Sequence, residues 1–207
     1  MNVSDEYQTL ISRGESLFKD KGSKFFGYAF PVAGEEEVKG ILEEVKALHP
    51  KARHHCYAYR LGYLGENYRA NDDGEPSGSA GKPILNALLS ADVTFVLVIV
   101  VRYFGGTLLG VPGLIHAYKE AAAEALAVTE KEVRTMNTPV RIEYDFGQTN
   151  AVMQLIKKLN LTVKEQTFEE RCGILLEVRN SYIEKIREEL RDFWTIRVVI
   201  PEPGEGG

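Results

Sequence analysis

The stretch VTFVLVIVVRYFGGT, residues 93–107, decides the fold. Its first nine residues carry no charge and have no polar face, which is typical of a strand covered on both sides of its sheet. The two glycines end this strand, and an alanine-rich segment from about Gly113 to Val128 then has the spacing of an amphipathic helix. A buried strand, a glycine-rich loop and a helix predict an α+β domain with this strand at the centre of its sheet.

Further elements are expected on the N-terminal side of this strand. Apolar patterns predict strands over residues 24–32 and 54–61. A helix is expected from Glu35 to about His49, because three acidic residues at its start suit the helix dipole. A second helix is expected from Pro83 to about Ser90. These elements predict an α+β domain over residues 1–137.

The C-terminal third shows a regular succession of patterns. Strands and helices are expected in the order βαββαβ, over residues 140–146, 149–159, 161–168, 172–179, 181–190 and 195–200. This order predicts a ferredoxin-like domain over residues 138–201. Residues 135–139 are the expected linker, and the Gly/Glu/Pro tail, 202–207, is expected to be disordered.

The chain of 207 residues has the composition of an ordinary globular protein, and its net charge of −5 argues against nonspecific binding of nucleic acid. Any contact with RNA must therefore come from a local patch. No apolar run reaches the roughly 18 residues of a membrane span, and the first residues lack a signal-peptide pattern. We expect a cytoplasmic protein without membrane contact, with Cys56 and Cys172 reduced and buried.

A second glycine-rich loop, NDDGEPSGSAGKP, occupies residues 71–83. It is not a nucleotide-hydrolysing P-loop, because Pro76 stands at the position of the first glycine and Pro83 at that of the magnesium-binding hydroxyl. Amides at the start of a helix nevertheless bind anions. The candidate anion-binding residues are Ser77, Gly78, Ser79, Gly81 and Lys82. In the alternative, the loop is a structural turn that caps the following helix.

The loop after the central strand supplies further candidates for an anion or nucleic-acid site, Arg102, Tyr103, Phe104, Gly105 and Gly106. An arginine can hold a phosphate with two hydrogen bonds, and an aromatic ring can stack on a base. In the alternative, Phe104 fills the core and Arg102 pairs with an acid such as Asp72 or Asp73. The glycine spacing does not fit a dinucleotide fingerprint, and we expect no cofactor.

A weaker alternative is a hard cation bound by Asp72, Asp73 and Glu75, although such carboxylates also form ordinary solvated turns. Neighbouring residues His54, His55 and Cys56 cannot converge on one zinc ion, because successive side chains of a strand point to opposite faces. At most one of the two histidines faces a site, and we assign His55 to the anion site; in the alternative, each is a structural histidine. No nucleophile–base set is apparent, so a binding protein is more strongly indicated than an enzyme.

Several stretches resemble the YigZ/IMPACT family, namely SKF (23–25), HCYAYR (55–60), DDGEPSGSAGKPIL (72–85) and RYFGGT (102–107). The resemblance covers most of residues 15–128. It implies that the N-terminal domain has the fold of the second domain of ribosomal protein S-five. The region after residue 138 is similar to the second domain of bacterial members, which resembles the fifth domain of elongation factor G.

The resemblance implies a role in translation. Eukaryotic relatives regulate translation by interfering with activation of a stress kinase, and bacterial members are proposed to bind nucleic acid or the translation machinery. We expect a regulatory protein that binds RNA or ribosome-linked factors through its glycine loops, with the sheet face of the C-terminal domain as a second contact. The alternative is an enzyme for a small phosphorylated or carboxylated metabolite, with Asp72, Asp73, Glu75 and His55 as candidate acid–base or metal groups. The oligomeric state stays open.

The chain departs from the family pattern beside the second loop. Leu108, Pro112 and His116 stand where the family commonly has Lys, Gly and often Arg. The loss of two cations weakens a phosphate site at residues 105–116 and moves the expected site towards Lys82 and Arg102.

Overall fold

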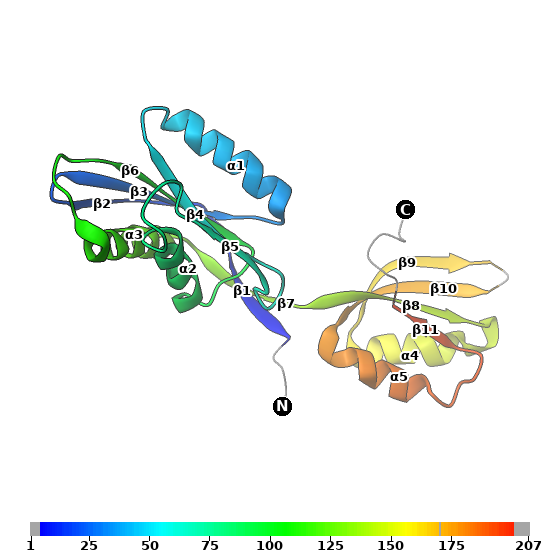
Figure 1. Ribbon diagram of the computed structural model, residues 1–207. Coiled ribbons are helices and arrows are strands. Elements are labelled where there is room, and N and C mark those ends of the chain that lie inside the picture. The colour runs from blue at the N-terminus through cyan, green and yellow to red at the C-terminus, as the bar shows by residue number, and fades with distance from the viewer. Residues whose placement is uncertain (1–4, 170, 201–207) are drawn as a thin grey trace. The chain divides into compact units, whose positions relative to one another are not determined.

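The computed structural model describes residues 5–169 and 171–200, which divide into two compact units (Figure 1). The first unit comprises Glu6–Arg134, and the second comprises the chain from Thr135 onward together with Asp5. The boundary thus lies three residues before the expected one. The expected linker is largely strand, because β7 (Lys131–Thr135) and β8 (Asn137–Tyr144) occupy most of it. The tail at 202–207 lies outside the described residues.

A five-stranded antiparallel sheet forms the centre of the first unit. Its strand order is β2 (Gly14–Asp20), β3 (Ser23–Pro31), β6 (Val96–Tyr103), β4 (His54–Leu61) and β5 (Asn67–Asn71). The apolar strand β6 is the central one, as the sequence predicts, and its residues 96–102 are all buried.

Helices cover both faces of this sheet (Figure 1). Helix α1 (Glu35–Leu48) lies on one face, and α2 (Gly81–Ser90) and α3 (Gly110–Ala127) lie on the other. Alternate residues of β6 divide between the two cores, with Val98 on the α2/α3 side and Leu97 on the α1 side. Gly27 lets α3 approach closely, because a Cβ there would lie 2.4 Å from the carbonyl oxygen of Ala121.

Strand β1 (Glu6–Leu10) pairs with β7 in a separate two-stranded sheet. The sequence does not predict β1, β2, β5 or β7. Within the described ranges, no helix is long and apolar enough to cross a membrane.

The second unit has the expected order of elements. After β8 come α4 (Thr149–Leu159), β9 (Thr162–Phe168), β10 (Cys172–Arg179), α5 (Ile183–Leu190) and β11 (Arg197–Val199), with short 3-10 turns at Phe146–Gln148 and Asn180–Tyr182. The antiparallel sheet order is β11-β8-β10-β9. One face packs on the helices through a core that includes Ile142, Ile174, Leu155 and Ile186.

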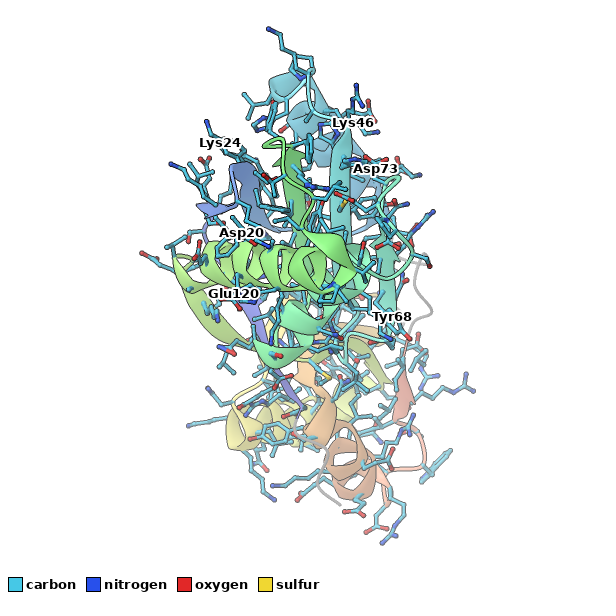
Figure 2. All side chains as sticks on the ribbon, turned by 60° about the vertical axis from the view of Figure 1, so that its left-hand side comes forward. Asp20, Lys24, Lys46, Tyr68, Asp73 and Glu120 are labelled. Carbon is cyan, nitrogen blue, oxygen red and sulfur yellow. The ribbon has the colours of Figure 1, made fainter. Side chains whose placement is uncertain are left out.

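The strand register of the first unit brings both glycine-rich loops to one end of the sheet. Strand β6 ends there at Tyr103, which is the register partner of Lys24 next to the β2–β3 turn. On its other side, Arg102 is the partner of His54 at the start of β4. We call this the loop end, comprising residues 19–24, 49–54, 72–82 and 103–109; Lys24 and Asp73 mark it in Figure 2.

Candidate functional site

The carboxylate of Asp72 occupies the amides that the sequence assigned to an external anion. It accepts hydrogen bonds from the N–H groups of Gly78 (2.8 Å), Ala80 (3.0 Å) and Gly81 (2.8 Å). Partial burial by itself raises the pKa of Asp72, but these bonds outweigh it and hold the pKa below its ordinary value of 3.8. The expectation of free amides at Gly78 and Gly81 is therefore wrong, because the loop supplies its own anion.

The other candidates of this loop differ in their accessibility. Ser79 is buried, and both its amide (2.9 Å) and its hydroxyl (2.6 Å) donate to the carbonyl oxygen of Pro76. Ser79 is therefore also a structural residue. Ser77 and Lys82 are exposed, and neither has a hydrogen-bond or ion-pair partner in the part of the chain that the structure describes. These two side chains are free to meet a ligand.

Arg102 belongs to a buried network and does not face solvent. Its Nη1 lies 2.7 Å from Oε1 of Glu75, and the two side chains are 9% and 3% exposed. The Tyr118 hydroxyl donates to the same carboxylate oxygen at 2.8 Å and accepts from the Cys56 thiol at 3.3 Å. Burial raises the pKa values of Cys56 and Tyr118 well above their ordinary values. The prediction that Arg102 binds an external anion is therefore wrong. Arg102 pairs with an acid, and that acid is Glu75.

Arg102 also supports an aromatic side chain at the surface. Its guanidinium lies 5.7 Å from the ring centroids of both Phe25 and Phe104. Phe25 is fully buried, whereas Phe104 is 59% exposed. Phe104 therefore does not fill the core; the buried ion pair holds it from one side.

His55 lies inside the unit, which corrects its expected place at an anion site. Its ring is buried, and its Nε2 has no hydrogen-bond partner among the described residues. Its backbone N–H donates to Oδ2 of Asp73 at 2.6 Å, and its Nδ1 lies 3.8 Å from the same oxygen. The neighbouring Cys56 faces the α2/α3 core, whereas Tyr57 packs on the α1 side, as expected for successive strand residues.

The metal alternative does not fit the three acidic side chains of the first loop. Asp72 is bound to amides, Asp73 to the backbone of β4, and Glu75 to an arginine and a tyrosine. Over residues 5–169 and 171–200, no group of three or more ligating side chains is placed to hold a metal ion.

The second glycine loop is attached to the β2–β3 turn. The Gly105 amide donates to the Ser23 hydroxyl at 3.1 Å, and a Cβ on Gly105 would lie 1.9 Å from the carbonyl carbon of Gly22. Only glycine fits this contact, so Gly105 is structural. Gly106 is exposed, has a φ of 90° and has open space around it. Both glycines are exposed, but only Gly106 is free of the contact with the β2–β3 turn.

Tyr103 is fixed by a histidine of the α1 side. Nδ1 of His49 lies 3.0 Å from the Tyr103 hydroxyl, and its Nε2 lies 2.6 Å from the Tyr28 hydroxyl. Burial, together with the charge of His55 to a lesser degree, lowers the pKa of His49. A neutral imidazole has one donor and one acceptor nitrogen, which suits a position between two hydroxyl groups.

An open pocket of 310 Å³ lies beside Tyr103. Its lining residues come from the β2–β3 hairpin and the end of β6, and they are Gly22, Lys24, Phe26, Tyr103 and Phe104. The Phe26 and Tyr103 rings meet edge to face, with centroids 5.8 Å apart. The pocket thus combines three aromatic rings with one ammonium group.

The loop end carries several cations without ion-pair partners among the described residues. Six exposed basic residues of the loop end have no ion pair within the described ranges: Lys19, Lys21, Lys24, Lys51, Arg53 and Lys82. Sequence reasoning singled out only Lys82. The segment KDKGSK, residues 19–24, carried the missing signal, because three lysines in six residues around a glycine turn predict a basic hairpin tip.

The departures from the family pattern lie on the exposed start of α3. Leu108 is 83% exposed, and Pro112 and His116 are exposed as well. Nδ1 of His116 lies 3.8 Å from Oε1 of Glu120, one helical turn further along. The cations at the loop end therefore lie on the hairpin, before β4 and at the start of α2, and not on α3.

The open face of the sheet in the second unit has mixed charge. Residues Arg141 and Glu143 flank the buried Ile142 and so point to the opposite face, where Arg197 is the register partner of Glu143. Arg141 and Arg197 have no ion pair among the described residues. This face has fewer free cations than the loop end.

Comparisons with known proteins give a consistent result. The family model for the Impact N-terminal domain matches residues 21–126. An IMPACT family member of Haemophilus influenzae is 34% identical over 195 residues, which are 92% of this chain and 95% of the relative. The IMPACT family member YvyE of Bacillus subtilis is 33% identical, covering 79% and 76% of the two chains. A crystal structure of a hypothetical protein matches 97% of the chain with a TM-score of 0.69 and 25% identity.

Proposed function

Because the chain belongs to the IMPACT family, we propose that it is a translation-associated regulatory protein that binds RNA or ribosome-linked factors through the loop end of its first unit. The family resemblance supports the role in translation. It also supports an S-five-like fold for the first unit and a ferredoxin-like fold for the second, and a cytoplasmic location.

The observation that carries this proposal is the group of six unpaired cations at the loop end. The loop end also holds four acidic residues, Asp20, Asp72, Asp73 and Glu75, and the charge of Glu75 is balanced by Arg102. Six unpaired cations against the three remaining carboxylates leave this end with an excess of positive charge although the chain has a net charge of −5. Phosphate groups of RNA suit such a surface, and the binding is modest and sensitive to salt.

The enzyme alternative receives less support. Its candidate acid–base groups were Asp72, Asp73, Glu75 and His55. Asp72 and Glu75 are bound inside the fold, and the ring of His55 is buried. A catalytic group must reach a reacting atom, and these groups would have to break internal contacts first.

Fluorescence anisotropy with a labelled single-stranded RNA 12-mer tests the RNA contact. The variant Lys19→Gln/Lys21→Gln/Lys24→Gln is expected to bind about tenfold more weakly, from roughly 0.5 kcal/mol for each exposed ion pair. The control Arg69→Gln/Lys119→Gln/Lys131→Gln removes the same charge from exposed residues outside the loop end. The control is expected to bind like the wild type. Equal losses in both triple variants, or no binding by the wild type, would contradict the RNA site at the loop end.

A further inference from the structure

We propose that the pocket lined by Lys24, Phe26, Tyr103 and Phe104 receives one unpaired base of single-stranded RNA, while Lys19, Lys21 and Lys24 contact the neighbouring phosphates. This inference rests on the proposed function and names the ligand class at the same surface. Binding in this pocket requires a base that is unpaired and unstacked, so double-stranded RNA is excluded as the ligand.

The aromatic lining is arranged before any ligand arrives. Phe104 is held by the guanidinium of Arg102, which is itself fixed by the buried Glu75. Tyr103 is fixed through its hydroxyl, which lies 3.0 Å from Nδ1 of His49. The pocket therefore pays little ordering entropy on binding, which favours a small planar ligand.

The exposure of Phe104 is the feature that indicates stacking. Its ring is 59% exposed although it lies at the end of the central strand. With the guanidinium over one ring face, the other face is available to a base, and base–aromatic stacking is tolerant of sequence. The volume of 310 Å³ lies at the lower end of the ~300–1,000 Å³ typical of ligand pockets and is large enough for a base.

The lysines are placed to follow the backbone of the same strand. Lys24 lines the pocket, and Lys19 is its direct partner across the β2–β3 hairpin. Lys21 occupies the tip of this hairpin with a φ of 44°, followed by Gly22 with a φ of 82°. Asn or Gly is the favoured residue at such a position, so the turn geometry does not explain the lysine. A contact between the charge of Lys21 and a phosphate accounts for the lysine at this position.

A pair of RNA ligands separates stacking from phosphate binding. The first is a uridine 12-mer, and the second is a 12-mer of the same length and charge whose sugars carry no bases. Wild-type protein is expected to bind the uridine 12-mer about tenfold more tightly, because stacking acts only on the first ligand. Phe104→Leu keeps an apolar side chain but loses the π-face, and should bind the two ligands equally. Phe168→Leu, at a phenylalanine that is 63% exposed on β9, is the matched control and should behave as the wild type.

The outcomes distinguish this inference from the proposed function. If the wild type binds both ligands equally well, or if Phe104→Leu keeps the full preference, the base pocket is wrong while the phosphate contact stands. If neither ligand binds, the RNA contact of the proposed function fails as well. Binding of wild-type protein to a protein factor at this pocket, with RNA unable to compete, would also overturn the inference.

Discussion

At the scale of single residues, Asp72 shows how a loop with the composition of an anion receptor can serve the fold alone. The sequence predicted that main-chain amides of this loop bind an anion, and three of them do bind a negative group. That group comes from the same loop, six to nine residues away in the chain. Composition could not reveal this pairing, because it depends on the turn geometry between Asp72 and Gly81.

Asp72→Asn tests the internal anion. The variant is expected to lose about 1–3 kcal/mol of unfolding free energy at pH 7, because hydrogen bonds to a charged acceptor are weakened. The pKa of Asp72 is lower in the folded than in the unfolded chain, so its stabilising contribution is complete above pH 3.8 and is lost as the pH falls further. Urea unfolding at several pH values should therefore show the difference from the wild type narrowing in acid. Glu124→Gln, on the exposed side of α3, is the control; a pH-independent loss in Asp72→Asn would contradict the account.

Lys21→Asn separates stability from binding at the hairpin tip. Asn tolerates a positive φ better than Lys, so the variant should be more stable by up to about 1 kcal/mol. It should bind the RNA 12-mer about twofold to fivefold more weakly, because one exposed phosphate contact is lost. Thermal unfolding and anisotropy measure the two effects, with Lys131→Gln as the control for charge. Unchanged RNA binding would remove Lys21 from the site.

At the scale of elements, the buried ion pair connects the first glycine loop to the central strand. Glu75 and Arg102 lie 27 positions apart in the chain, and the sequence offered an acidic partner for Arg102 only as the alternative, naming Asp72 or Asp73 in place of Glu75. The pairing also changes how variants are interpreted. An Arg102 substitution acts on folding before it acts on ligand binding, so it is unsuitable as a test of the binding site.

Arg102→Met should destabilise the first unit by about 3–5 kcal/mol, because Glu75 is left buried without its partner. Adding Glu75→Leu should recover a large part of this loss, since two apolar side chains tolerate the same environment. Urea denaturation of Arg102→Met, Glu75→Leu and the double variant measures the effect. A double variant that is as unstable as the sum of the two single changes would show that the pair is not the coupled unit described.

The elements that sequence patterns predicted are those whose pattern follows from burial. Strand β6 is apolar throughout because both of its faces are covered, and β4 and α1 have clear periodicity. The strands that the sequence did not predict form by hydrogen bonding to neighbouring strands, and their own residues show no clear apolar pattern. All five residues of β5 are exposed or half-buried, and β2 directs Ser16 towards α3 while Leu17 is 43% exposed. Such edge strands carry no readable alternation.

At the scale of the whole molecule, an acidic chain presents a local basic surface. The sequence predicted that any RNA contact needs such a patch, and the stretches that resemble the family lie at the end of the sheet where this surface is found. The resemblance could not identify the unpaired cations, because the residues that match the family motif mostly form contacts inside the fold. The unpaired lysines of the hairpin lie at the edge of that motif, where strand register pairs Lys24 with Tyr103 and Lys19 with Lys24, and Lys24 lines the same pocket as Phe104.

The salt dependence of RNA binding tests the central claim most directly. For a single strand, the slope of log Kobs against log salt falls by about 0.7 for every phosphate contact. The variant Lys19→Gln/Lys21→Gln/Lys24→Gln should therefore show a slope that is shallower by about 2 than that of the wild type. The Arg69/Lys119/Lys131 control should keep the wild-type slope. Identical slopes for the wild type and the hairpin variant would contradict the assignment of the phosphate contacts to the loop end.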